Sequence, residues 1–112
     1  MIRILSVAFL LLTGAAQAAD APARVISVGG AITEIIYALG AGDLVVASDT
    51  TSYYPPEAAE TPKVGYMRAL SAEGVLSMSP DLVILAADAG PPPVIEQLDT
   101  AGVNLLKIGP AR

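Results

Sequence analysis

The chain alternates short, largely apolar segments with stretches of helical periodicity, and this alternation narrows the folds that it can adopt. Four segments have the β-branched or leucine-rich character of buried strands, at residues 24–28, 44–47, 82–85 and 103–108. Helices are predicted between them, at residues 31–39, 71–77 and about 91–101. Apolar strands separated by helices are typical of a parallel β-sheet flanked by helices, so we predict an α/β fold.

The carboxyl ends of parallel strands meet at one edge of the sheet, and ligands of such sheets bind there. The predicted ends lead into Gly29–Gly30, residues 48–63, residues 86–90 and Gly109–Pro110. The sequence stops soon after the fourth predicted strand, where we expect a finished domain to continue into a helix. We therefore expect residues 19–112 to be one lobe of a longer protein.

Residues 1–18 have the three-part layout of a secretory signal peptide. Arg3 supplies the positive region, Ile4–Leu12 the apolar run and Ala16–Ala18 the cleavage site. Spanning a bilayer takes about 20 apolar residues, so this run is too short to be a membrane anchor. We predict export to the periplasm and cleavage after Ala18 or the next residue.

The composition excludes several classes of function. The formal net charge is −5, with 6 Lys and Arg against 11 Asp and Glu, and the basic residues are scattered, which argues against nucleic-acid binding. The chain has no histidine and no cysteine, so the usual ligands of zinc, copper and iron–sulfur clusters and the usual bases and nucleophiles are missing. Gly29–Gly30 lacks the third glycine of a dinucleotide-binding loop. We predict a protein that is not an enzyme.

The segment from Asp49 to Arg68 contains three of the four tyrosines and is the candidate binding surface. The alternative is that these rings pack against the domain. Tyr66 is the strongest candidate, because Gly65 before it allows close backbone approach and Arg68 supplies a cation two residues later. A tyrosinate can ligate ferric haem iron, and an arginine beside it can bind a propionate or favour the deprotonated phenol.

Several segments resemble the iron-siderophore, haem and cobalamin binding proteins of ABC importers. The resemblance lies in residues 25–40, 53–56 and 79–84 and covers essentially the whole mature chain. Residues 63–77, with the run Gly65-Tyr66-Met67-Arg68, are similar to the haem branch of that family.

The resemblance implies a fold of two α/β lobes joined by a rigid helix, of which this chain supplies the first lobe. It also implies that Tyr66 ligates the haem iron and that Glu73 contacts arginines of the permease that receives the haem. Two alternatives stay open. The ligand is a ferric siderophore or cobalamin on the same fold, or the chain is an exported α/β domain without a small ligand.

Overall fold

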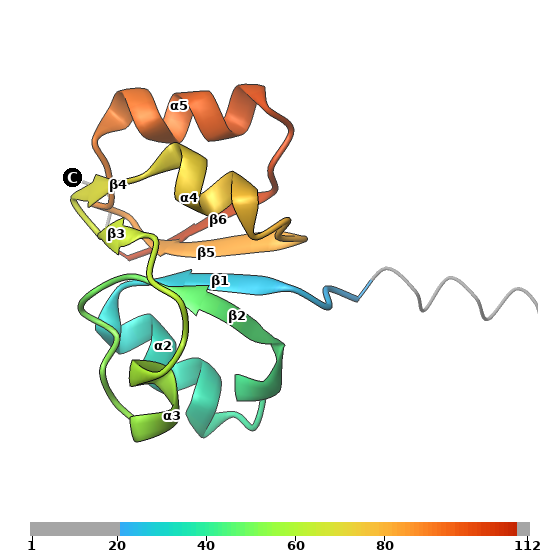
Figure 1. The fold of residues 1–112 in the computed structure, drawn as a ribbon, viewed down its shortest axis with the longest axis vertical. Helices are drawn as coiled ribbons and strands as arrows, with labels where there is room; N and C mark the ends of the chain where they lie inside the picture. Colours follow the sequence, from blue (N-terminus) through green and yellow to red (C-terminus); the bar gives the residue numbers. More distant parts are fainter. Residues whose placement is uncertain (1–20, 110–112) are drawn as a thin grey trace, which may run out of the picture.

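The structure is a computed structural model that describes residues 21–109, so the predicted signal peptide lies outside the described residues. Its main sheet has four strands: β1 (Val25–Val28), β2 (Val45–Ser48), β5 (Leu82–Ala86) and β6 (Leu105–Ile108). The strand order is β2-β1-β5-β6 and every neighbouring pair is parallel (Figure 1). The predicted parallel α/β fold is confirmed, and each strand lies within two residues of its predicted limits.

Helices cover both faces of this sheet. They are α2 (Gly30–Ala38), α3 (Pro56–Ala59), α4 (Ala72–Ser77) and α5 (Pro92–Thr100), with a 3₁₀ turn, η2, at Gly42–Leu44. Helix α2 lies on one face, and α4 and α5 lie on the other (Figure 1). Two elements were not predicted from the sequence: α3 and a small antiparallel hairpin, formed by β3 (Gly65–Tyr66) and β4 (Ala69–Leu70).

The core follows from the alternation of side chains along the strands. On the α4–α5 face, Ile26, Val28, Val83 and Leu85 form one cluster with residues of both helices and the hairpin. Helix α2 packs on the opposite face through a second cluster, which consists of Val25, Ile32, Ile36 and Val45.

Helix α2 packs on β1 and β2 and reaches β5, whose Leu82, Ile84 and Ala86 pack against the second cluster. Ile84 is the register partner of Leu106, so these side chains share a face of the sheet. On the edge strand β6, Leu106 and Ile108 are 47% and 46% exposed.

Candidate functional site

The β3–β4 hairpin is fixed to the carboxyl edge of the sheet by backbone hydrogen bonds. Thr50 N–H, just after β2, donates to Gly65 O at 2.9 Å. Gly90, in the loop after β5, donates to Met67 O at 2.9 Å and accepts from Leu70 N–H at 3.0 Å. The hairpin therefore lies beside the ends of β2 and β5, at the edge where ligands of parallel sheets bind (Figure 1).

Tyr66 lies on β3, opposite Ala69, and its side chain is 45% exposed. Gly65 before it has φ of 105°, a conformation that L-residues with a side chain rarely adopt. A Cβ at this position would come within 3.0 Å of Ala69 O. The glycine thus permits the close strand pairing that holds the half-exposed Tyr66 at the edge.

Arg68 lies in the turn of the same hairpin, two residues from Tyr66. Its Nη2 contacts Asp88 Oδ2 at 3.2 Å, and both side chains are 63% exposed. Asp88 lies in the loop after β5, and the sequence analysis did not identify it. The only available signal was its place three residues beyond the end of the strand predicted at residues 82–85. This is the single salt bridge within residues 21–109.

Glu73 is exposed in the first turn of α4. The helix begins immediately after the hairpin, and Ser71 caps it because its Oγ accepts a hydrogen bond from Gly74 N–H at 2.8 Å. The carboxylate of Glu73 is therefore presented to solvent close in sequence to Tyr66 and Arg68. Its predicted contact with a permease stays a prediction.

A groove separates the other two tyrosines of the segment from α2. Tyr53 and Tyr54 are 73% and 60% exposed, so neither ring packs into the domain. They line the groove together with Thr51 and with residues of α2, which include Glu34 and Ile35. Because the groove lies where β1 and β2 end, it extends the candidate site along the carboxyl edge.

The buried side chain of Asp49 holds the loop after β2 in place through hydrogen bonds. It is fully buried, and its two oxygens accept four hydrogen bonds. The donors are Gly29 N–H, Thr51 N–H, Thr51 Oγ1 and Ser52 Oγ, at 2.8 to 3.1 Å. From the sequence, Asp49 was only the first residue of the candidate binding segment. Its bonds to the chain show instead that it joins the turn after β1 to the loop after β2.

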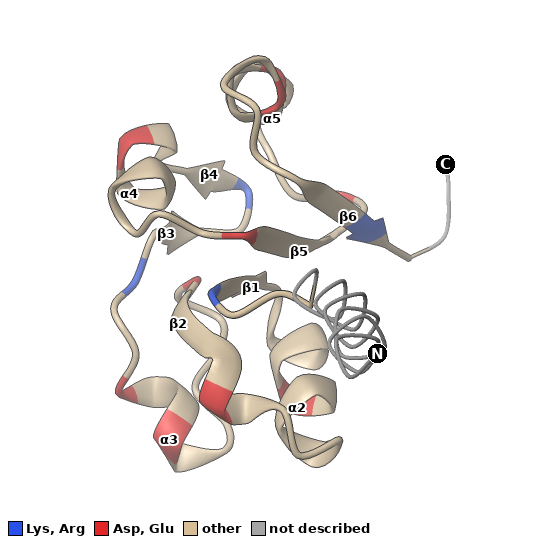
Figure 2. Cartoon of the chain, turned by 90° about the vertical axis from the view of Figure 1, so that its right-hand side faces the viewer, with Lys and Arg blue, Asp and Glu red and all other residues tan. Residues whose placement is uncertain are grey.

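Figure 2 shows the basic residues as isolated positions rather than as a patch. Lys63 is one of them, and its Nζ donates to Ser48 Oγ at 2.9 Å, Ser52 O at 2.9 Å and Ala58 O at 3.0 Å. Partial burial lowers the pKa of Lys63, while the nearby carboxylates of Asp49 and Glu60 act in the opposite direction. Its ammonium is committed to the loop, so we do not assign it to a ligand.

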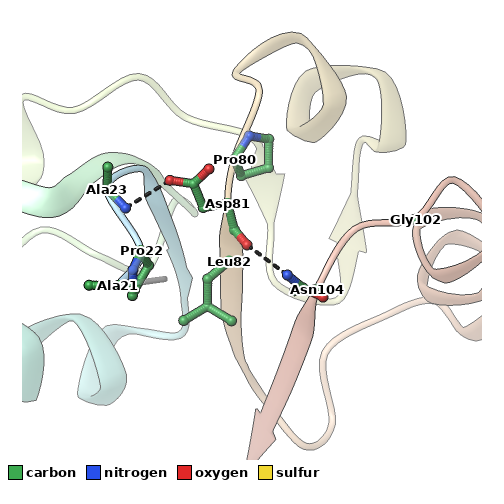
Figure 3. A pocket seen from close by; sticks show the side chains of 8 residues that line it. All are labelled: Ala21, Pro22, Ala23, Pro80, Asp81, Leu82, Gly102 and Asn104. Carbon is green, nitrogen blue, oxygen red and sulfur yellow. Dashed lines mark hydrogen bonds between the residues drawn. The ribbon is translucent and has the colours of Figure 1, made fainter. Parts of the chain in front are cut away.

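A pocket also lies at the opposite edge, where the strands begin (Figure 3). Its polar groups already serve the fold. Asp81 accepts from Ala23 N–H at 2.7 Å and from Arg24 N–H at 2.8 Å, and Asn104 donates to Asp81 O at 3.2 Å. The two backbone hydrogen bonds lower the pKa of the Asp81 carboxyl. We interpret these hydrogen bonds as structural, because they connect the starts of β1, β5 and β6.

The described residues contain no group of three or more His, Cys, Asp or Glu side chains placed to hold a metal ion. No helix within this part of the chain is long and apolar enough to cross a membrane.

A parallel α/β lobe with exposed tyrosines at its carboxyl edge defines a ligand-binding module. A family model described as periplasmic binding protein matches residues 25–109, and the chain belongs to this family. Two curated relatives are the vitamin B12-binding protein of Vibrio cholerae and an ABC transporter substrate-binding lipoprotein of Bacillus subtilis. The first is 36% identical over 106 residues, 94% of this chain and 38% of the relative. The second is 39% identical over 98 residues, 81% of this chain and 29% of the relative.

Solved structures of two kinds of binding protein share the fold. The periplasmic heme binding protein of Pseudomonas aeruginosa has a TM-score of 0.77 at 44% identity, over 79% of this chain and 32% of that one. The heme-binding protein RhuT of Roseiflexus sp. RS-1 has a TM-score of 0.73 at 49% identity, over 78% and 34%. The vitamin B12 binding protein BtuF of Vibrio cholerae has a TM-score of 0.71 at 35% identity, over 77% and 34%. This chain thus spans about a third of the length of its relatives.

Proposed function

We propose that the protein binds haem in the periplasm and that Tyr66 ligates the ferric iron through its phenolate oxygen. The observation that carries the proposal is the half-exposed Tyr66 ring on a hairpin that is bonded to the carboxyl edge of the sheet. An iron-bound phenolate is stable at neutral pH because the charge of the metal stabilises the anion, although a free phenol has a pKa of about 10.

Sequence identity supports haem over cobalamin. Haem-binding structures range from 32% to 50% identity to this chain, whereas vitamin B12-binding relatives range from 32% to 39%, so the two ranges overlap and the support is modest. Cobalamin is the second candidate, because several curated relatives are named as vitamin B12-binding proteins.

The first test is the absorption spectrum of the complete product of this reading frame with ferric protoporphyrin. We expect a Soret band and a charge-transfer band in the wild type. Tyr66→Phe keeps the ring and removes the oxygen, so the charge-transfer band should disappear. Affinity should fall by at least about tenfold, since losing even an outer-shell partner of a metal site costs that much.

Tyr53→Phe and Tyr54→Phe are the matched controls, because each removes one phenol oxygen from the same edge. We expect both to keep the wild-type spectrum. If either control loses the charge-transfer band while Tyr66→Phe retains it, the iron ligand is misassigned. If the wild type binds cyanocobalamin in the same titration and does not bind ferric protoporphyrin, the cobalamin alternative replaces haem.

We further propose that the protein delivers its ligand to the permease of an ABC importer in the inner membrane. Two observations support this step. A 39% identical relative is named as an ABC transporter substrate-binding lipoprotein, and Glu73 presents an exposed carboxylate at the start of α4. Exposed charges of this kind act chiefly on the rate of association between partners.

A further inference from the structure

The Arg68–Asp88 pair leaves most of the guanidinium unused. Asp88 takes one contact, from Nη2 at 3.2 Å, which is longer than the 2.7–2.9 Å of a strong charge-assisted hydrogen bond. A guanidinium carries five N–H donors in a planar fork and can bind a carboxylate through two of them. Asp88 is therefore a weak partner for a group that is able to bind another carboxylate more fully.

The fold brings the two side chains together although both are exposed. Arg68 follows Met67 in the hairpin turn, and Asp88 precedes Gly90 by two residues in the loop after β5. The hydrogen bonds of Gly90 to Met67 O and from Leu70 N–H join these two segments directly. The backbone thus sets a carboxylate of the protein beside the one cation of the Tyr66 hairpin.

We propose that Asp88 competes with ligand carboxylates for Arg68 and so weakens the binding of a carboxylate-bearing ligand at this edge. The inference rests on the proposed function, because the two propionates of haem are such carboxylates. When a propionate approaches Arg68, two carboxylates face one guanidinium, and Asp88 must rotate into water. Exposed ion pairs change equilibria by less than about tenfold, so this competition is modest and keeps binding reversible.

The experiment compares wild type and Asp88→Asn in the complete product of the reading frame. The probes are ferric protoporphyrin and its dimethyl ester, which keeps the ring and iron but has no carboxylates. We expect Asp88→Asn to raise the affinity for the free acid about two- to fivefold and to leave ester affinity unchanged. In an Arg68→Gln background, Asp88→Asn should no longer raise the affinity for the free acid.

Asp99→Asn is the control for net charge, because Asp99 is exposed near the far end of α5 and makes no side-chain hydrogen bond or salt bridge within the described residues. Equal affinity of Asp88→Asn and Asp99→Asn for the free acid would overturn the inference, as would an equal gain with the ester. If the wild type binds neither porphyrin, the proposed function fails and takes the inference with it. Circular dichroism of each variant establishes that the fold is intact.

Discussion

Replacement of Asp49 by asparagine tests whether this buried carboxylate holds the tyrosine-bearing loop in place. In the structure, Oδ1 accepts from Gly29 N–H and Ser52 Oγ, and Oδ2 accepts from Thr51 N–H and Thr51 Oγ1. Asparagine keeps one oxygen and places an NH₂ donor where the other oxygen was. Whichever way the amide turns, it faces a backbone N–H that has no rotational freedom to become an acceptor.

The expected cost follows from these four bonds. The threonine and serine hydroxyls can rotate, so they recover part of their bonding, whereas one backbone N–H loses its acceptor. An unsatisfied buried donor costs about 1–3 kcal/mol, and the surviving bonds lose their charge-assisted character. We expect the free energy of unfolding to fall by about 2–4 kcal/mol, a large fraction of the 5–15 kcal/mol typical of a domain.

The hydroxyl chain beyond Asp49 adds to this cost. Ser27 Oγ, Thr33 Oγ1 and Ser52 Oγ lie in sequence at 2.7 Å steps, and the last donates to Asp49 at 2.8 Å. A carboxylate only accepts, so every hydroxyl in the chain must donate toward Asp49. An amide turned toward Ser52 would reverse the whole chain and leave Ser27 in need of a different acceptor.

Urea unfolding followed by far-ultraviolet circular dichroism measures the effect. For a domain of this size, with a slope of about 1 kcal/mol per molar urea, the midpoint should fall by about 2 M or more. Asp99→Asn makes the same chemical change on an exposed helix position and should shift stability by less than about 0.5 kcal/mol. A shift below 0.5 kcal/mol for Asp49→Asn would refute the argument that the four bonds hold the loop.

Two further predictions concern docking and acid stability. Glu73→Ala should slow importer-coupled haem uptake and weaken the salt dependence of uptake, while haem affinity stays unchanged. Uptake assays and haem titrations measure the two effects. Lost haem affinity with normal uptake coupling would contradict the docking role. The pKa of Asp81 is lowered from its ordinary value of 3.8, so its carboxylate stabilises the fold at pH values above 3.8. This contribution is lost as pH falls through the folded-state pKa. Asp81→Asn should therefore be less stable than wild type at pH 7, and the difference in urea midpoint should shrink below about pH 4; a difference that is constant from pH 7 to 3 would exclude the carboxylate as its source.

Local pattern was sufficient to predict the layers of the fold. The four strands are runs of apolar residues long enough to show their character, and three of the helices begin or end at residues with strong local preferences. Ser71 as the cap of α4 and Gly102 after α5 are examples, the second with φ of 87°. These preferences act over a few residues and do not depend on the rest of the chain.

The hairpin that carries Tyr66 could not be predicted in the same way. Its strands are two residues long, too short for any periodicity to register, and Gly90 and Thr50 hold it through bonds to other segments. Tyr66 became a candidate from its neighbours and a family resemblance. Its position at the carboxyl edge and its half-exposed ring depend on the tertiary structure.

By itself the sequence determined the fold class and the segment that contains Tyr66, the candidate iron ligand. Only the tertiary structure decided which charges meet there. Asp88 lies 20 residues from Arg68, and Asp49 lies 20 residues from Gly29, so neither contact has a local signature. The strand order β2-β1-β5-β6 brings these distant loops to one edge, because parallel strands place all their carboxyl ends together.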